Sequence, residues 1–91
     1  MKLKCMVLEK SIIHQKAIEK MVKYHPNLEM AGIYNSSLEA NQHLKNYNID
    51  LMFLDVDMPL LSGFDFLGSL KNPPKTILTS NNADYAAKAF E

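Results

Sequence analysis

The feature that most constrains the fold is the segment at residues 49–54 (IDLMFL), the most hydrophobic stretch of the chain, which ends abruptly at Asp55. A short run of this kind is typical of a central strand in a parallel sheet, where helices cover both faces. Open sheets of parallel strands bind their ligands beyond the carboxyl ends of the strands. The run therefore predicts an α/β fold and places the carboxylate of Asp55 where such a fold keeps its binding site.

The rest of the chain alternates a strand with a helix, four times in all. Short apolar runs bounded by turn residues predict strands at residues 3–8, 28–34, 49–54 and 76–80. Helices are predicted between Ser11 as N-cap and Pro26, from Ser36 as N-cap to about Lys45, over residues 64–71, and over residues 83–91. This alternation favours a doubly wound sheet with right-handed crossovers.

Two local patterns support the first two helices. In the first helix, apolar residues at positions 13, 17, 18, 21 and 22 predict the stripe that packs on the sheet. In the second, Ser36 and Glu39 have the spacing of a capping box, in which each side chain bonds to the backbone of the other residue.

The composition limits what the chain can be. A length of 91 residues with 47% hydrophobic content suits one domain, residues 1–91, with a single core. Ten basic and ten acidic side chains cancel, so no overall field attracts nucleic acid or an anionic membrane. Cys5 has no partner for an intramolecular disulfide, which suits a reducing compartment. No signal peptide or membrane-spanning segment is evident, so we expect a cytoplasmic protein.

Polar side chains follow three of the predicted strands. They are Glu9 and Lys10 after the first, Asp55 and Asp57 after the third, and Thr79 and Ser80 after the fourth. Because the carboxyl ends of parallel strands meet at one edge of a sheet, we expect these residues to converge on one pocket.

The segment IDLMFLDVDMPLLSGFDFL resembles the phosphoacceptor segment of CheY-like response-regulator receiver domains, in which a hydrophobic strand ends in Asp and a Met-Pro pair follows. The tail TILTSNNADYAAKAFE is similar to the fourth strand and helix of receivers in LytTR-type two-component regulators. This resemblance implies a flavodoxin-like sheet with strand order 2-1-3-4. It also implies that the chain ends before the family's fifth strand, with its conjugating lysine, and fifth helix, and that no effector domain is included.

The resemblance assigns roles by position. Asp55 matches the phosphoacceptor, the backbone carbonyl of Asp57 matches a contact to Mg²⁺, and Ser80 matches the hydroxyl that bonds the phosphoryl group. Glu9 matches the first residue of an acidic pair that holds the metal. A metal ion is useful because a carboxylate that attacks a phosphoryl group brings like charges together, at about 4 kcal/mol per unit pair at 4 Å and a dielectric near 20.

Lys10 departs from the family pattern, because it stands at the second position of that acidic pair. An ammonium group has donors and no acceptor, so it cannot bind Mg²⁺, and its charge repels the ion. We therefore expect weak or absent Mg²⁺ binding, with the Asp57 side chain or the longer Glu9 compensating in part. Lys10 is also a candidate to offset the charge of Asp55 directly.

The leading functional hypothesis is a receiver that accepts a phosphoryl group on Asp55 from a histidine kinase or phosphotransfer protein, rather than an enzyme with its own substrate. Three alternatives remain open. The first is a pseudo-receiver that binds partners without phosphorylation, and the second treats Glu9, Lys10 and Ser80 as ordinary turn and capping residues. The third, a phosphatase of the haloacid-dehalogenase type using Asp55 and Asp57, is disfavoured because that family places Asp-x-Asp after its first strand.

Overall fold

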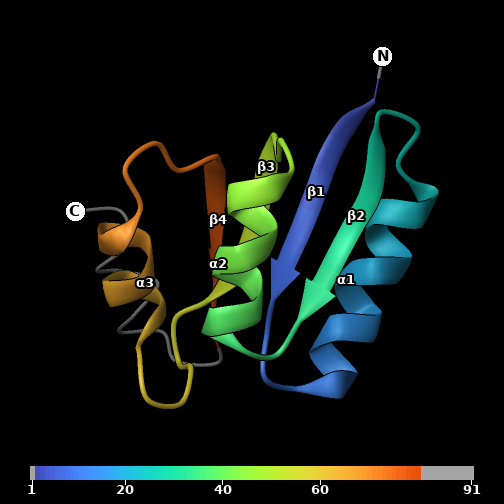
Figure 1. Ribbon diagram of the computed structural model, residues 1–91. Helices are drawn as coiled ribbons and strands as arrows, with labels where there is room; N and C mark the ends of the chain where they lie inside the picture. Colours follow the sequence, from blue (N-terminus) through green and yellow to red (C-terminus); the bar gives the residue numbers. More distant parts are fainter. Residues whose placement is uncertain (1, 81–91) are drawn as a thin grey trace.

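The computed structural model describes residues 2–80, in which four strands alternate with three helices (Figure 1). The strands are β1 (Leu3–Leu8), β2 (Leu28–Tyr34), β3 (Leu51–Asp55) and β4 (Lys75–Thr79). The helices are α1 (Ile12–Tyr24), α2 (Ser37–Asn46) and α3 (Gly63–Ser69). The helix predicted at residues 83–91 lies outside the described residues.

The four strands form one sheet in the order β2-β1-β3-β4, and every neighbouring pair is parallel. This confirms the predicted fold class and strand order. Leu8 at the end of β1 is in register with Tyr34 of β2 and with Leu54 of β3. Asp55 of β3 is in register with Thr79 of β4. All four strands therefore end at the same edge of the sheet.

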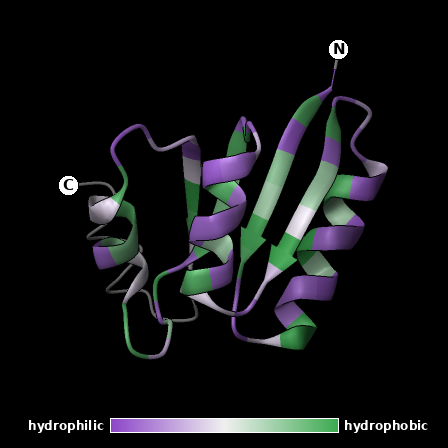
Figure 2. Ribbon diagram, in the orientation of Figure 1, coloured by the Kyte–Doolittle hydropathy of each residue, from purple (hydrophilic) through white to green (hydrophobic). Residues whose placement is uncertain are grey.

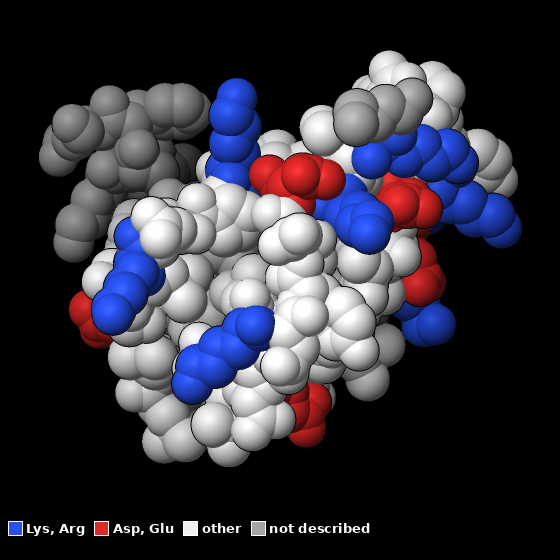
Figure 3. Space-filling model, turned by 45° about the horizontal axis from the view of Figure 1, so that its top comes forward, with Lys and Arg blue, Asp and Glu red and all other residues white. Residues whose placement is uncertain are grey.

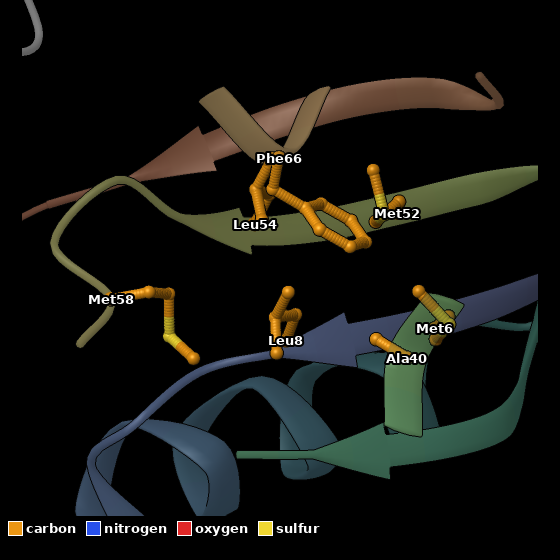
Figure 4. Close-up of a cluster of buried hydrophobic side chains, with 7 residues drawn as sticks. All are labelled: Met6, Leu8, Ala40, Met52, Leu54, Met58 and Phe66. Carbon is orange, nitrogen blue, oxygen red and sulfur yellow. The ribbon is translucent and has the colours of Figure 1, made fainter. Parts of the chain in front are cut away.

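Helices cover both faces of the sheet, as the hydrophobic character of β3 predicts. One face packs against α2 and α3 through a cluster of buried residues that Figure 4 shows: Met6, Leu8, Ala40, Met52, Leu54, Met58 and Phe66. The other face packs against α1 through Cys5, Val7, Val22 and Phe53. Figure 2 shows many hydrophobic residues in the strands and hydrophilic residues along α1 and α2.

Each helix begins at a serine whose hydroxyl accepts a backbone hydrogen bond, as expected of an N-cap. Ser11 and Ser36 cap α1 and α2, in agreement with the prediction. Ser62 caps α3 by accepting from the N–H of Asp65, so this helix begins at Gly63 and not at residue 64. Strands β3 and β4 are also displaced from their predicted bounds, by one or two residues.

The buried stripe predicted for α1 is wrong in part. Ile13 is 78% exposed and Met21 is 50% exposed. The helix packs on the sheet through Ile18 and Val22. Ile18 and Val22 are four residues apart and so lie on the same face of the helix, which makes the buried stripe narrower than predicted.

None of the helices within residues 2–80 combines the length and apolar character needed to cross a bilayer. Figure 3 looks toward the end of the molecule where the strands begin, and there lysine and acidic side chains lie next to one another. On that face the charges are therefore mixed rather than gathered into a field of one sign.

Candidate functional site

The carboxyl edge of the sheet brings together most of the polar residues that the sequence placed after the strands. Hydrogen bonds or ion pairs connect Glu9, Lys10, Asp55, Asp57 and Thr79. Ser80 directly follows β4 at the same edge and is exposed. These five residues therefore converge as predicted, through contacts between them. For Ser80, its position at the same edge agrees with the prediction.

Asp55, the last residue of β3, is buried and has its two carboxylate oxygens in different surroundings. The side chain is 4% exposed. Its Oδ1 accepts a hydrogen bond from the backbone N–H of Asp57 at 2.9 Å. Its Oδ2 lies 3.5 Å from the backbone nitrogen of Lys10, a longer and weaker contact. Oδ1 is thus held by its own loop, and Oδ2 has the longer contact with the backbone.

Gly63 lies close to the backbone of Asp55 and Val56 at the end of β3. Its N–H donates to the carbonyl oxygen of Val56 at 2.8 Å, which ties the start of α3 to the end of β3. A Cβ at position 63 would lie 2.4 Å from the carbonyl oxygen of Asp55. Only glycine allows this close approach of the two backbones.

Glu9 is the second buried acid of the site, at 3% exposed. Its Oε2 accepts from the N–H of Ser11 at 3.1 Å and its Oε1 accepts from the hydroxyl of Thr79 at 3.4 Å. Burial, and next a side-chain hydrogen bond with Asp55, raise the pKa of Glu9, while the Ser11 N–H and His14 act in the opposite direction. The protonated form of Glu9 is therefore favoured relative to an exposed glutamate.

Lys10 forms an ion pair with Asp57, with Nζ 3.0 Å from Oδ2. The hydrogen bond to Asp57 raises the pKa of Lys10, so the side chain stays a cation. The sequence suggested that Lys10 offsets the charge of Asp55 directly. In the structure its ammonium group contacts Asp57, and only its backbone contacts Asp55.

The donors at this site do not fit a tightly held Mg²⁺ ion. Mg²⁺ favours charged oxygen ligands in a near-ideal octahedron. Here the carboxylate of Asp57 is already paired with the ammonium group of Lys10, whose positive charge repels a metal ion. Across residues 2–80, no three Asp, Glu, His or Cys side chains are placed to hold a metal ion.

Three contacts to Glu9 were missed by sequence reasoning. The hydroxyl of Thr79 reaches Glu9, a pairing that the predicted convergence did not specify. The Nδ1 of His14 lies 3.7 Å from Oε1 of Glu9, and the amide of Gln15 donates to the Glu9 carbonyl oxygen at 2.6 Å. The position of His14 and Gln15 in the first turn after β1 was the available signal, because that turn faces the carboxyl edge of the sheet.

Comparison with known proteins identifies the family. Residues 5–91 match the response regulator receiver domain family. A protein-glutamate methylesterase/protein-glutamine glutaminase of Yersinia pestis is 27% identical over 96 residues, which cover 99% of this chain and 28% of that protein. One of Albidiferax ferrireducens is 28% identical, over 99% of this chain and 26% of that protein. The chain thus spans under a third of the length of these relatives.

Solved structures show the same fold. The response regulator domain of Thermotoga maritima CheB gives a TM-score of 0.82 at 21% identity, covering 99% of this chain and 72% of that one. The response regulatory domain of mrkE from Klebsiella pneumoniae gives 0.83 at 21% identity, covering 97% and 75%. On the sheet order, the acidic carboxyl edge and the family match, the chain belongs to the response regulator receiver domains of two-component systems.

Proposed function

We propose that the chain accepts a phosphoryl group on Asp55 and uses this modification to change its binding partners. The observation that carries the proposal is the position of Asp55, buried at the end of β3 with Oδ1 held by the Asp57 N–H and Oδ2 lying 3.5 Å from the backbone nitrogen of Lys10. Receiver domains typically bind histidine kinases or phosphotransfer proteins. A phosphohistidine of such a partner is the proposed donor.

The transfer balances when the donor imidazole carries a proton on its other ring nitrogen, so that it leaves as neutral imidazole. Oδ2 of Asp55 attacks phosphorus, the P–N bond to the donor imidazole breaks, and the electron pair leaves with the imidazole. The new acyl phosphate adds negative charge at the carboxyl edge of the sheet. Ser80 is exposed and lies one residue beyond β4. Its hydroxyl is proposed to donate a hydrogen bond to the phosphoryl group, which would change the surface at the end of β4 when Asp55 is modified.

Mass spectrometry tests the proposal directly. Incubation with a small acyl phosphate, with and without Mg²⁺, is expected to add one phosphate mass that hydroxylamine removes. Asp55→Asn is expected to abolish the adduct. Asp50→Asn, the same change at the opposite end of β3, serves as the matched control and should leave labelling intact. An adduct that persists in Asp55→Asn, or no adduct in either buffer, would contradict the assignment of Asp55.

Mg²⁺ typically occupies the acidic pocket of receiver domains. For this chain we propose that its affinity is low, with Glu9, Asp55 and the backbone carbonyl of Asp57 as ligands. Lys10→Asp should restore the missing carboxylate and tighten binding. Equal Mg²⁺ affinity for the wild type and Lys10→Asp, measured by calorimetric titration, would show that Lys10 does not weaken the site.

A second candidate function is a pseudo-receiver that binds a partner without being phosphorylated. The ion pair between Lys10 and Asp57 favours this second function, because it places a lysine and a paired carboxylate where a metal ion would neutralise the phosphoryl group. Failure of the chain to form an adduct under conditions that label an intact receiver would favour this function. The position of Asp55 after the third strand gives no support to a phosphatase of the haloacid-dehalogenase type.

We further propose a LytTR-type regulator in the cytoplasm as the setting of this domain. Association of two copies through β4 is part of the same proposal, since β4 is the last strand of the described sheet and Ile77 is 47% exposed. An edge strand with apolar side chains can pair with another chain. Sedimentation at increasing concentration tests this, and a monomer at all concentrations would exclude it.

A further inference from the structure

Lys10 and Asp57 form an ion pair with each other, and the backbone of each also contacts the carboxylate of Asp55. The backbone nitrogen of Lys10 lies 3.5 Å from Oδ2 of Asp55, and the backbone nitrogen of Asp57 lies 2.9 Å from Oδ1. The side chains of the same two residues meet at 3.0 Å. Both members of the ion pair are therefore anchored next to Asp55 by their own backbones, although they are 47 positions apart in the sequence.

The ion pair of Lys10 is exposed enough for its ammonium group to change partner. Its side chain is 48% exposed and that of Asp57 is 66% exposed. An ion pair that exposed is weak, because water screens it and two long side chains lose freedom to form it. A phosphoryl group on Oδ2 of Asp55 would carry more negative charge than the carboxylate of Asp57 and would stand beside the backbone of Lys10. It would therefore compete well for the ammonium group.

We propose that the Lys10 ammonium group is the resident cation of this site, which moves from Asp57 to the phosphoryl oxygens when Asp55 is modified, so that phosphorylation needs no divalent metal ion. This inference rests on the proposed function of Asp55. It accounts for the two features that disfavour Mg²⁺, the lysine in place of a carboxylate and the pairing of Asp57. It also gives Asp57 a role, because Asp57 holds the cation near the site while Asp55 is unmodified.

In this reaction Lys10 forms and breaks no covalent bond. Oδ2 of Asp55 forms a bond to phosphorus, the bond from phosphorus to the donor breaks, and its electron pair leaves with the donor. The ammonium group keeps all its protons and stabilises the negative charge on the non-bridging oxygens by hydrogen bonding. Its direct contact with the phosphoryl group would make Lys10 a catalytic residue of the transfer.

The test compares labelling rates by a small acyl phosphate in a chelator and in Mg²⁺. The wild type is expected to be labelled at similar rates in both buffers. Lys10→Gln should lower both rates by about tenfold or more, as expected when one charged donor to a transferring phosphoryl group is lost. Lys71→Gln removes the same charge at the opposite end of the sheet and is the matched control.

The outcomes separate this inference from the proposed function. Labelling of Asp55 that requires Mg²⁺ in the wild type would overturn the inference and leave Asp55 as the phosphoacceptor. Unchanged labelling of Lys10→Gln in the chelator, or an equal loss in the control Lys71→Gln, would also overturn it. No labelling of the wild type in either buffer would overturn both proposals.

A measurement of stability gives an independent readout. A ligand that binds only the folded state raises the melting temperature. Mg²⁺ is expected to leave the melting temperature of the wild type unchanged and to raise that of Lys10→Asp. A rise of equal size in both proteins would contradict a resident cation at position 10.

Discussion

The contact of Gly63 with the backbone of Asp55 leads to a prediction with a built-in control. A Cβ at position 63 would lie 2.4 Å from the carbonyl oxygen of Asp55 and 2.7 Å from Cα of Val56. Both atoms belong to the backbone at the end of β3, so no side chain can rotate to make room. The same end of β3 is bonded to β4, since the N–H of Val56 donates to the carbonyl of Thr79 at 3.0 Å.

The size of the effect follows from this geometry. Real Cβ atoms essentially never approach a heavy atom more closely than 3.0 Å. The start of α3 or the end of β3 must therefore move by more than about half an ångström in Gly63→Ala, and overpacking of this kind destabilises proteins by about 1–3 kcal/mol. We expect the upper part of this range, because the displaced atoms carry hydrogen bonds of the sheet and of the α3 connection.

Gly68 in the same helix should respond in the opposite direction. A Cβ at position 68 would meet nothing within 4 Å. Alanine in place of glycine inside a helix stabilises it by about 0.5–1 kcal/mol. Urea unfolding followed by far-ultraviolet circular dichroism measures both changes. In thermal melts, each kcal/mol should shift the midpoint by about 4–8 °C for a domain of this size.

The pair of variants can refute the reasoning in two ways. If Gly63→Ala is as stable as the wild type, the close approach to Asp55 is not a constraint on this fold. If Gly68→Ala is destabilised to the same extent as Gly63→Ala, then α3 does not tolerate alanine in general, and the effect at position 63 is not caused by contact with β3.

Four further predictions concern the core and the loops. Burial, and next the charge of Asp50, raise the pKa of the Cys5 thiol above its ordinary value of 9.0. The stability that the neutral thiol contributes is therefore full below pH 9.0 and is lost as the pH rises through the pKa of the folded state. Unfolding measured at rising pH should show this loss in the wild type and not in Cys5→Ala. Phe66 is 1% exposed, and Phe66→Ala should lower the free energy of unfolding by about 3–5 kcal/mol in urea titrations. Tyr34→Phe removes the hydroxyl that bonds Nδ1 of His43 at 2.5 Å, and the same assay should show a loss of about 1 kcal/mol. Leu60 has a φ of 69°, so Leu60→Asn should stabilise the loop by about 0.5–1 kcal/mol, and a destabilised Leu60→Asn would mean that the leucine side chain contributes to folding.

Much of the fold was predictable because its signals are local. The bounds of β1 and β2 and the N-caps at Ser11 and Ser36 agree with the prediction, since each depends on a few adjacent residues. The spacing of Ser62 and Asp65 carried the same signal for α3 and was overlooked. His43 is partly buried against Tyr34, a contact that no local pattern indicates, because β2 presents that tyrosine to α2.

The candidate site was predictable in outline and not in its bonds. The hydrophobic run before Asp55 placed the carboxylate at the carboxyl edge of the sheet, as the structure has it. The partner of Lys10 could not be read from the sequence, because a long side chain in this position can reach Asp55, Asp57 or solvent. The register of β1 and β3 and the path of the loop after β3 select Asp57.

The amino-acid sequence alone determined the alternation of strands and helices, the parallel sheet and the edge at which Asp55 stands, because these follow from the periodicity of neighbouring residues. The tertiary structure decided which stripe of α1 is buried, that Glu9 is buried against Asp55, and that Lys10 pairs with Asp57. These contacts join residues more than forty positions apart or depend on how one element leaves another. They exist only once the strands are aligned, since the free energy of burial and of ion pairing depends on distance in space and not along the chain.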